Sequence, residues 1–158
     1  MITFQISRYM RKKSYKRKRG PVQAKKVSYD GINFASGLER YMYMALKKAK
    51  IKAKYEGQTY EIVKGFNFTN TCIARTAGGK GDYKDRGNKK ILPIKYTPDF
   101  IGDDFIIECK GRANESFPLR WKLFKKYLID NKIKTTLYKP QNQKQCDETV
   151  KLILSLQK

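Results

Sequence analysis

Two carboxylates and a lysine in the second half of the chain have a spacing that suits a metal site. Asp99 precedes the apolar run 105–107, and Glu108 and Lys110 follow that run. A turn at residues 103–104 would fold this stretch into a hairpin that pairs Asp99 with Glu108, with Cβ atoms roughly 5 Å apart. Carboxylates at that distance repel each other unless a cation lies between them. Their oxygens suit Mg²⁺, which binds through few carboxylates and several waters, and we expect Mn²⁺ to substitute.

Strand geometry separates the side chains that follow the apolar run. Because side chains alternate along a strand, Glu108 and Lys110 are expected on one face and Cys109 on the other, and the Cys109 carbonyl could supply another ligand. Acid-x-Lys triplets also occur at residues 82–84 and 130–132, as chance predicts in a lysine-rich chain. The spacing alone therefore leaves open an ordinary surface pair of acids with neighbouring lysines. Glu108 differs from the other two acids because it closes a strand-like run.

Glu39 is a third candidate acid, and it has two possible roles. Residues 36–39 (SGLE) open a segment whose apolar residues recur at helical spacing. Ser-x-x-Glu is a capping box, in which the glutamate reaches back to the N-cap amide, and the helix dipole also stabilises a carboxylate in the first turn. Capping alone would explain Glu39, so a structural role and a catalytic role both stay open.

Composition narrows the chemistry and the partners. The chain has 158 residues, the size of one domain, and a formal net charge of +22. This charge predicts a polyanionic partner, with nucleic acid as the default and binding that weakens steeply with salt. The chain contains no histidine, which excludes a histidine general base, Ser-His-Asp chemistry and His-ligated zinc. Water must therefore be activated by carboxylate, lysine or metal.

The cysteines and the apolar runs of the chain indicate its compartment and its contact with membranes. The three cysteines are widely spaced and form no C-x-x-C pair, which indicates neither a zinc ribbon nor a disulfide framework. No apolar run is long enough to span a bilayer, and the start of the chain does not resemble a signal peptide. We expect an intracellular protein with no membrane partner, in the host cytoplasm if the chain is phage-encoded.

The chain divides into a basic segment and one domain. Residues 1–26 form an arm that we expect to be mobile until it meets DNA, and residues 27–158 form the domain, with a flexible insertion rich in Gly, Asn and Lys at about 67–90. For any single cation a solvated surface role is an alternative to contact with DNA. The candidate DNA-binding residues are Arg11, Lys12, Lys13, Lys16, Arg17, Lys18, Arg19, Arg112, Arg120 and Lys122.

The order of predicted elements indicates an α/β fold, a mixed β-sheet flanked by helices. We expect a helix that Ser116 caps, with Leu119 among its inward residues, and a final helix at 147–156 with Val150, Ile153 and Leu154 inward. Trp121 is expected in the core or at its rim. The other predicted elements are a short strand within 27–34 with a turn at residues 30–31, a helix from 36 to about 50, one or two strands within 51–63, and a strand at 133–138.

Three motifs, taken in order, resemble a known family. Residues 36–39 (SGLE), 96–100 (YTPDF) and 108–111 (ECKG) are similar to successive motifs of the bacteriophage endonuclease I family of Holliday-junction resolvases, within the PD-(D/E)xK nuclease superfamily. The similarity covers roughly residues 34–127. At a further glutamate of that family this chain has Lys54, with Glu56 two residues on.

The resemblance implies a restriction-endonuclease-like core, Mg²⁺-dependent cleavage of branched DNA in recombination, and a homodimer. Carried over by motif, Glu39 is the helix-borne acid, Asp99 and Glu108 are the metal ligands, and Lys110 is the catalytic lysine. In the mechanism we expect, a second ion partly held by Glu39 could stabilise the leaving oxygen. Two alternatives stay open: a nicking or double-strand endonuclease for ordinary duplex, and a basic DNA-binding protein without catalysis.

Overall fold

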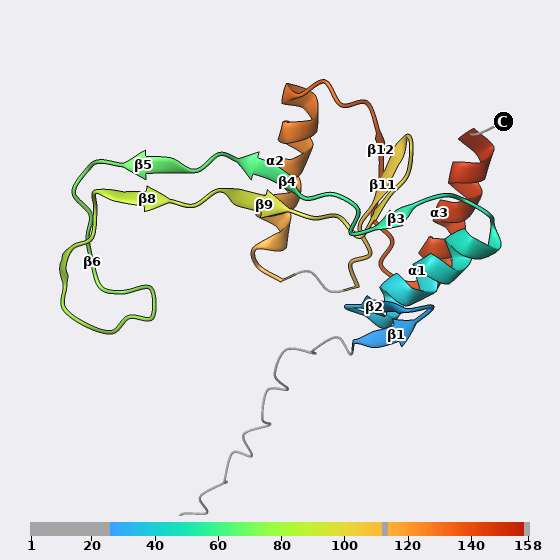
Figure 1. Ribbon diagram of the computed structural model, residues 1–158, viewed down its shortest axis with the longest axis horizontal. Helices are drawn as coiled ribbons and strands as arrows, with labels where there is room; N and C mark the ends of the chain where they lie inside the picture. Colours follow the sequence, from blue (N-terminus) through green and yellow to red (C-terminus); the bar gives the residue numbers. More distant parts are fainter. Residues whose placement is uncertain (1–25, 112–113, 157–158) are drawn as a thin grey trace, which may run out of the picture.

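The computed structural model describes residues 26–111 and 114–156, which form an α/β fold with several small sheets (Figure 1). The predicted turn at Asp30 and Gly31 is confirmed, and the structure has two strands around it where one short strand was expected: β1 (Val27–Tyr29) and β2 (Ile32–Phe34) pair in antiparallel fashion. Both turn residues have positive φ, which glycine adopts freely and aspartate tolerates.

The largest sheet has four strands in the order β12, β11, β10, β3 and is mixed. Strand β11 (Phe105–Ile107) runs parallel to β12 (Thr136–Tyr138), whereas β10 (Phe100–Ile101) is antiparallel to both β11 and β3 (Lys54–Tyr55). In the β10–β11 hairpin Phe100 pairs with Ile107 and Ile101 with Ile106. This is the register that the sequence predicted.

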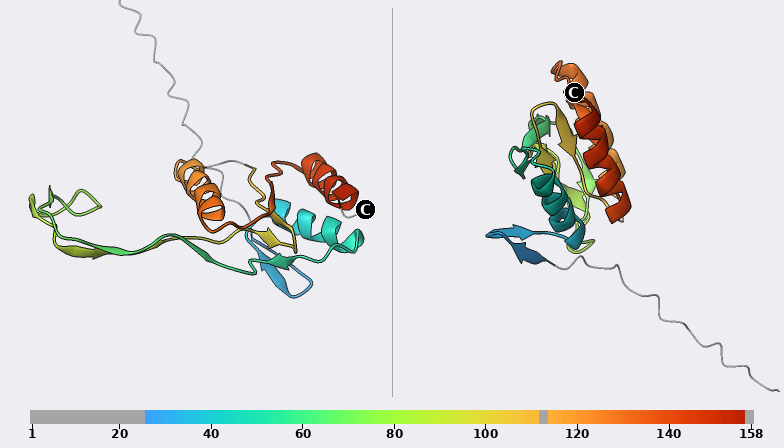
Figure 2. Two further views of the ribbon diagram at one scale, coloured as in Figure 1. Left: turned by 90° about the horizontal axis from the view of Figure 1, so that it is seen from above. Right: turned by 90° about the vertical axis from the view of Figure 1, so that its right-hand side faces the viewer.

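Both faces of β11 are buried, which places the sheet between helices. Phe105 and Ile107 belong to a core cluster that also includes residues of α1 (Gly37–Lys48) and α3 (Gln143–Leu156). Ile106 points the other way, into a second cluster with α2 (Phe117–Asp130). The continuous apolar run in β11 is the pattern of a strand covered on both sides. Figure 2 shows the helices on the two sides of this sheet.

Helix α1 agrees with its prediction, and the other two helices differ in detail. Leu119 of α2 is 62% exposed, whereas Trp121, expected in the core or at its rim, is buried. Ser116 makes no side-chain cap hydrogen bond, and Asn114 Oδ1 accepts from the Phe117 amide at 3.0 Å. Helix α3 begins at residue 143, before its predicted start; it turns Cys146, Thr149 and Ile153 inward and leaves Leu154 41% exposed.

The segment predicted as a flexible insertion forms paired strands. Strand β4 (Tyr60–Val63) pairs with β9 (Ile94–Tyr96), and the chain between them continues as a long two-stranded ribbon. The ribbon contains β5 (Phe66–Phe68) with β8 (Lys89–Ile91), and β6 (Ile73–Ala74) with β7 (Lys84–Asp85). We call residues 66–91 the β-ribbon; it extends away from the helices in green and yellow in Figure 1.

No helix within residues 26–111 and 114–156 is long and apolar enough to cross a membrane.

Candidate functional site

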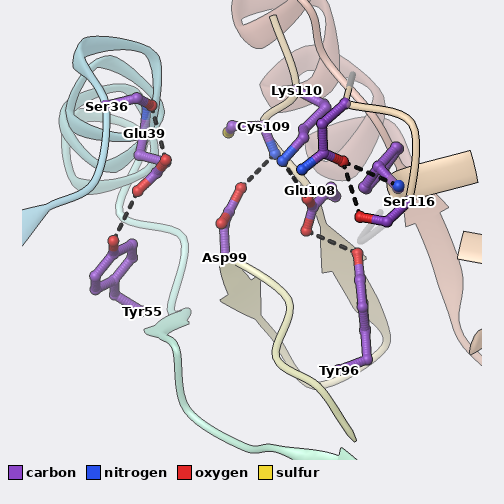
Figure 3. Close-up of polar contacts among 11 residues, drawn as sticks. Ser36, Glu39, Tyr55, Tyr96, Asp99, Glu108, Cys109, Lys110 and Ser116 are labelled. Carbon is purple, nitrogen blue, oxygen red and sulfur yellow. Dashed lines mark hydrogen bonds and ion pairs between the residues drawn. The ribbon is translucent and has the colours of Figure 1, made fainter. Parts of the chain in front are cut away.

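The β10–β11 hairpin and the segments that flank it bring together the acids and the lysine predicted from spacing (Figure 3). Asp99 immediately precedes β10 and Glu108 immediately follows β11, so the register places them opposite each other. The Cys109 amide donates to Asp99 Oδ2 at 2.5 Å. Lys110 Nζ lies 3.8 Å from Glu108 Oε1. The Cys109 side chain belongs to the core cluster with α1 and α3, as the alternation of the strand predicted.

Backbone hydrogen bonds fix both sides of the hairpin. The Glu108 amide donates to the Tyr138 carbonyl and the Lys110 amide to the Pro140 carbonyl, each at 3.0 Å, which extends the parallel pairing with β12. On the other side the Glu56 amide donates to the Asp99 carbonyl at 2.8 Å. Glu56 thus meets the site through its backbone, and its side chain is exposed. The main chain around Asp99, Glu108 and Lys110 is therefore held by its neighbours on each side.

Burial raises the pKa values of the two hairpin acids, Asp99 and Glu108. Burial, followed by the charges of Glu108 and Glu39, raises the pKa of Asp99 to about 8. Burial also raises the pKa of Glu108, although the Tyr96 hydroxyl and Lys110 partly oppose the shift. Desolvation and like charge both disfavour the anionic forms, and a bound cation would reverse both effects. When no cation is bound, the ionised forms of Asp99 and Glu108 are therefore unfavourable.

Tyr96 holds one of these acids, a role that the sequence analysis did not predict. Its hydroxyl donates to Glu108 Oε2 at 2.7 Å in a buried contact. The ring packs against Trp121 and Phe124 of α2, so the hydroxyl is fixed by the second core cluster. Tyr96 lies within the YTPDF motif, but the contact depends on the fold around residue 108. The oxygen of Glu108 that faces away from Tyr96 is the one nearest to Lys110.

Glu39 lies at the start of α1, and its oxygens are occupied by hydrogen bonds. Ser36 Oγ donates to Glu39 Oε1 at 2.7 Å and in turn accepts from the Glu39 amide at 3.2 Å. Glu39 Oε2 accepts from the Ala35 amide at 3.0 Å and from the Tyr55 hydroxyl at 2.7 Å. This is a capping box shifted by one residue, because the amide it reaches precedes the N-cap. Tyr55 is a third hydrogen-bond partner of Glu39, and sequence spacing did not indicate it.

Glu39, Asp99 and Glu108 lie close enough for their charges to interact. The charge of Glu39 contributes to the raised pKa of both Asp99 and Glu108, and Asp99 stands between the other two in Figure 3. Within the described residues, however, no group of three or more Asp, Glu, Cys or His side chains is arranged to hold a metal ion. The residues still fit Mg²⁺, because this ion takes one or two carboxylates and keeps the rest of its shell for water and phosphate.

Further cations surround the hairpin pair. Lys110 Nζ lies 4.9 Å from the centroid of the Phe117 ring, and Lys139 Nζ lies 5.9 Å from the same ring. The guanidinium of Arg120 donates to the Lys95 carbonyl, which precedes Tyr96. A cation–π contact orients a lysine without neutralising it. The site therefore combines two buried acids with cations at its rim, an arrangement suited to a phosphate group.

The predicted DNA-binding residues have different outcomes. Arg120 and Lys122 are exposed on α2. Arg120 is partly committed to a backbone carbonyl, whereas Lys122 forms no ion pair with the described residues. The other predicted residues lie outside the described part of the chain: Arg11, Lys12, Lys13, Lys16, Arg17, Lys18, Arg19 and Arg112.

One family matches most of this domain. The model of DUF1064, a family described as proteins of unknown function, matches residues 19–144, so the chain belongs to the DUF1064 family. The match spans Glu39, the β-ribbon and the β10–β11 hairpin. No curated protein and no solved structure matches the chain.

Proposed function

We propose that this protein is a Mg²⁺-dependent endonuclease that hydrolyses DNA phosphodiester bonds, with a restriction-endonuclease-like core. The observation that carries the proposal is the half-buried Asp99 opposite the buried Glu108, with Lys110 Nζ 3.8 Å from the latter. A buried and a half-buried acid, both with raised pKa values and close to a lysine, cost free energy on folding, which is typical of sites that bind a cation or transfer a proton.

Each residue of the hairpin has a separate task. Asp99 and Glu108 would hold the ion, with the Cys109 carbonyl as a further ligand. When bound, Mg²⁺ would polarise the scissile phosphate and lower the pKa of a bound water. Lys110 would orient the attacking water or offset charge on the phosphate in the transition state. Tyr96 keeps Glu108 oriented by donating to the oxygen farther from Lys110.

Glu39 has a weaker claim to the metal. Its three hydrogen-bond partners occupy both carboxylate oxygens, so it can bind a second ion only by giving up or sharing one of these contacts. Its charge still acts on Asp99. We therefore assign Glu39 first to the helix cap and second to the catalytic group.

Branched DNA is the proposed substrate, and a homodimer the proposed form. Both rest on the motif resemblance to Holliday-junction resolvases. A two-fold dimer would present two equivalent sites to two strands of a junction. The basic rim of Lys110, Lys139 and Arg120 supports contact with phosphates but does not distinguish a junction from a linear duplex. We also propose that the protein acts inside the cell, where its DNA substrate is found.

The test is an incubation of the full chain with a synthetic four-way junction and with its linear duplex, in Mg²⁺, in Mn²⁺ and in a chelator. We expect metal-dependent cleavage with preference for the junction. Glu108→Gln and Lys110→Ala should bind DNA yet lose cleavage, while the matched surface variants Glu61→Gln and Lys134→Ala should cut normally. Preferred cutting of linear duplex would indicate an ordinary endonuclease. Tight binding without cutting in either metal would leave a DNA-binding protein and overturn the enzymatic proposal.

A further inference from the structure

The β-ribbon is a defined structure even though little of it is buried. The Arg86 amide donates to the Cys72 carbonyl at 2.8 Å, and Asp85 Oδ1 accepts from the Cys72 and Gly87 amides at 2.9 and 2.8 Å. A Cβ at Gly87 would lie 2.0 Å from the Asn70 carbonyl oxygen, so only glycine permits this close approach of the two strands. These contacts fix the pairing of β6 with β7.

The ribbon lacks the support of a core. Its strands are exposed or half-exposed on both faces, and the main contacts of β5 and β6 are with their own partners β8 and β7. An isolated two-stranded ribbon is marginally stable in water. The β-ribbon therefore adds little to the stability of the domain, and another molecule could cover either of its faces.

The positive charge of the β-ribbon indicates that the molecule it binds is negatively charged. Residues 66–91 contain six Lys and Arg and two Asp, an excess of four positive charges in 26 residues. Asp85 is committed to backbone amides, and Arg86 donates to the Ala74 and Asp82 carbonyls. The remaining cations are exposed and form no ion pair with other described residues: Arg75, Lys80, Lys84, Lys89 and Lys90.

Apolar groups lie among these cations. Phe66 is 53% exposed and Tyr83 is 71% exposed. Phe68 pairs with Lys89 in the register of β5 and β8, so an aromatic and a basic residue stand at opposed positions of the ladder. Cations placed to meet phosphates, with apolar groups that can contact base edges, suit nucleic acid. A second ribbon would bring the same excess charge, which disfavours pairing between two copies.

We infer that the β-ribbon is a DNA-binding finger that lies in the major groove of a duplex arm next to the cleavage site. This inference rests on the proposed nuclease function. A two-stranded β-ribbon fits the width of the major groove. The ribbon leads through β9 directly into residues 96–99, so its base is joined to the site. Lys84 lies fifteen positions before Asp99, so at about 3.3 Å per residue it is at most about 50 Å from the site, or roughly one and a half DNA turns.

The first experiment compares two fourfold substitutions by binding to a fluorescent duplex and a junction in chelator, where no cleavage occurs. One variant replaces Lys80, Lys84, Lys89 and Lys90 by Gln, and the control replaces the exposed body residues Lys48, Lys52, Lys134 and Lys151 by Gln. We expect the ribbon variant to bind about tenfold more weakly than the control at 0.15 M salt, and its log–log salt slope to fall by about 2 to 4. Equal losses in the two variants would overturn the inference.

The second experiment removes the finger. Residues 69–88 are replaced by Asn-Gly, which closes the Phe68–Lys89 pair with a two-residue turn. We expect an unchanged melting temperature and a DNA footprint about 10 to 15 base pairs shorter on one side of the site. If the footprint keeps its length, or if the variant instead turns a dimer into a monomer, the ribbon does not bind DNA in this way. Because binding is measured without metal, a failure of catalysis leaves these results interpretable.

Discussion

The carboxylate on α1 and the two on the β10–β11 hairpin differ in what their oxygens contact. Glu39 accepts hydrogen bonds from the Ser36 hydroxyl, the Ala35 amide and the Tyr55 hydroxyl. Asp99 accepts one from the Cys109 amide, and Glu108 accepts one from the Tyr96 hydroxyl. Buried carboxylates are costly unless donors or cations satisfy them. Glu39 has three hydrogen-bond donors, whereas each of the two hairpin carboxylates has one.

The difference in hydrogen-bond partners allows carboxylates to serve as a helix cap at one position and as metal ligands at another. A carboxylate with a full set of donors is a good helix cap and a poor ligand, because a metal ion must displace a donor. A pair with few donors and raised pKa values gains most when a cation arrives. We therefore expect substitutions at Asp99 to affect chemistry and substitutions around Glu39 to affect mainly folding.

The largest expected effect is the loss of cleavage in Asp99→Asn. Asparagine keeps the shape of the side chain but removes the charge that binds the ion, so we expect cleavage to fall at least about 10³-fold. Glu39→Gln should cost much less, about tenfold, because glutamine can still complete a capping box. The measurement is single-turnover cleavage of a junction at saturating enzyme. A loss in Glu39→Gln as large as that in Asp99→Asn would abolish the distinction between the two regions.

The second prediction concerns pH and metal. Asp99 has a pKa of about 8 in the folded protein and about 4 when unfolded, so between these values the folded state holds an extra proton and stability falls as pH rises. We expect a loss of at most about 1.4 kcal/mol per pH unit in chelator, which Asp99→Asn should remove. Because Mg²⁺ favours the ionised form, its stabilising effect should grow from pH 6 to pH 8.5.

Thermal and chemical denaturation at each pH, with and without Mg²⁺, would check this second prediction. Glu61→Gln is the matched control, since Glu61 is exposed on β4. A stability curve for Asp99→Asn that follows the wild type, or a Mg²⁺ effect that does not depend on pH, would contradict a raised pKa at a cation site.

The third prediction compares the two tyrosines that donate hydrogen bonds to Glu108 and Glu39. Tyr96→Phe removes the donor to Glu108 and should lower cleavage about 10- to 100-fold with little change in DNA binding, as expected for a residue that orients a ligand. Tyr55→Phe removes the matching donor to Glu39 and should lower the free energy of unfolding by about 1 kcal/mol with a small effect on cleavage. Equal effects of the two substitutions on cleavage would mean that Glu39 and Glu108 work as one unit.

Local patterns predicted the hairpin well because its geometry is short-range. A turn at residues 103–104 and the alternation of β11 fix the register, which places Asp99 opposite Glu108. The cap of α1 was also accessible, because Ser36 and Glu39 are three residues apart. At α2 the same reasoning failed: the second helical residue is Pro118, which has no amide hydrogen to offer the N-cap, and Asn114 Oδ1 instead accepts from the Phe117 amide and from the Ser116 hydroxyl.

Long-range contacts were not accessible from local patterns. Tyr55 and Glu39 are sixteen residues apart and meet because β3 joins β10. The β-ribbon pairs Phe66 with Ile91 across a stretch whose Gly and Asn content indicated a flexible loop. In both cases the partner lies beyond the window in which periodicity carries information. The candidate acids could therefore be predicted, but not the donors that distinguish their roles.

The smallest expected effect tests the cap itself. Ser36 and Ser116 both occupy N-cap positions, but only Ser36 accepts a cap hydrogen bond, from the Glu39 amide. Ser36→Ala should lower the free energy of unfolding by about 1 kcal/mol, whereas Ser116→Ala should cost less than about half of that. Urea denaturation of both variants in chelator measures the difference. Because Ser36 also donates to Glu39 Oε1, its loss frees one carboxylate oxygen. The freed oxygen can then bind a metal ion, so we expect Ser36→Ala to bind Mg²⁺ more tightly than the wild type although it folds less stably.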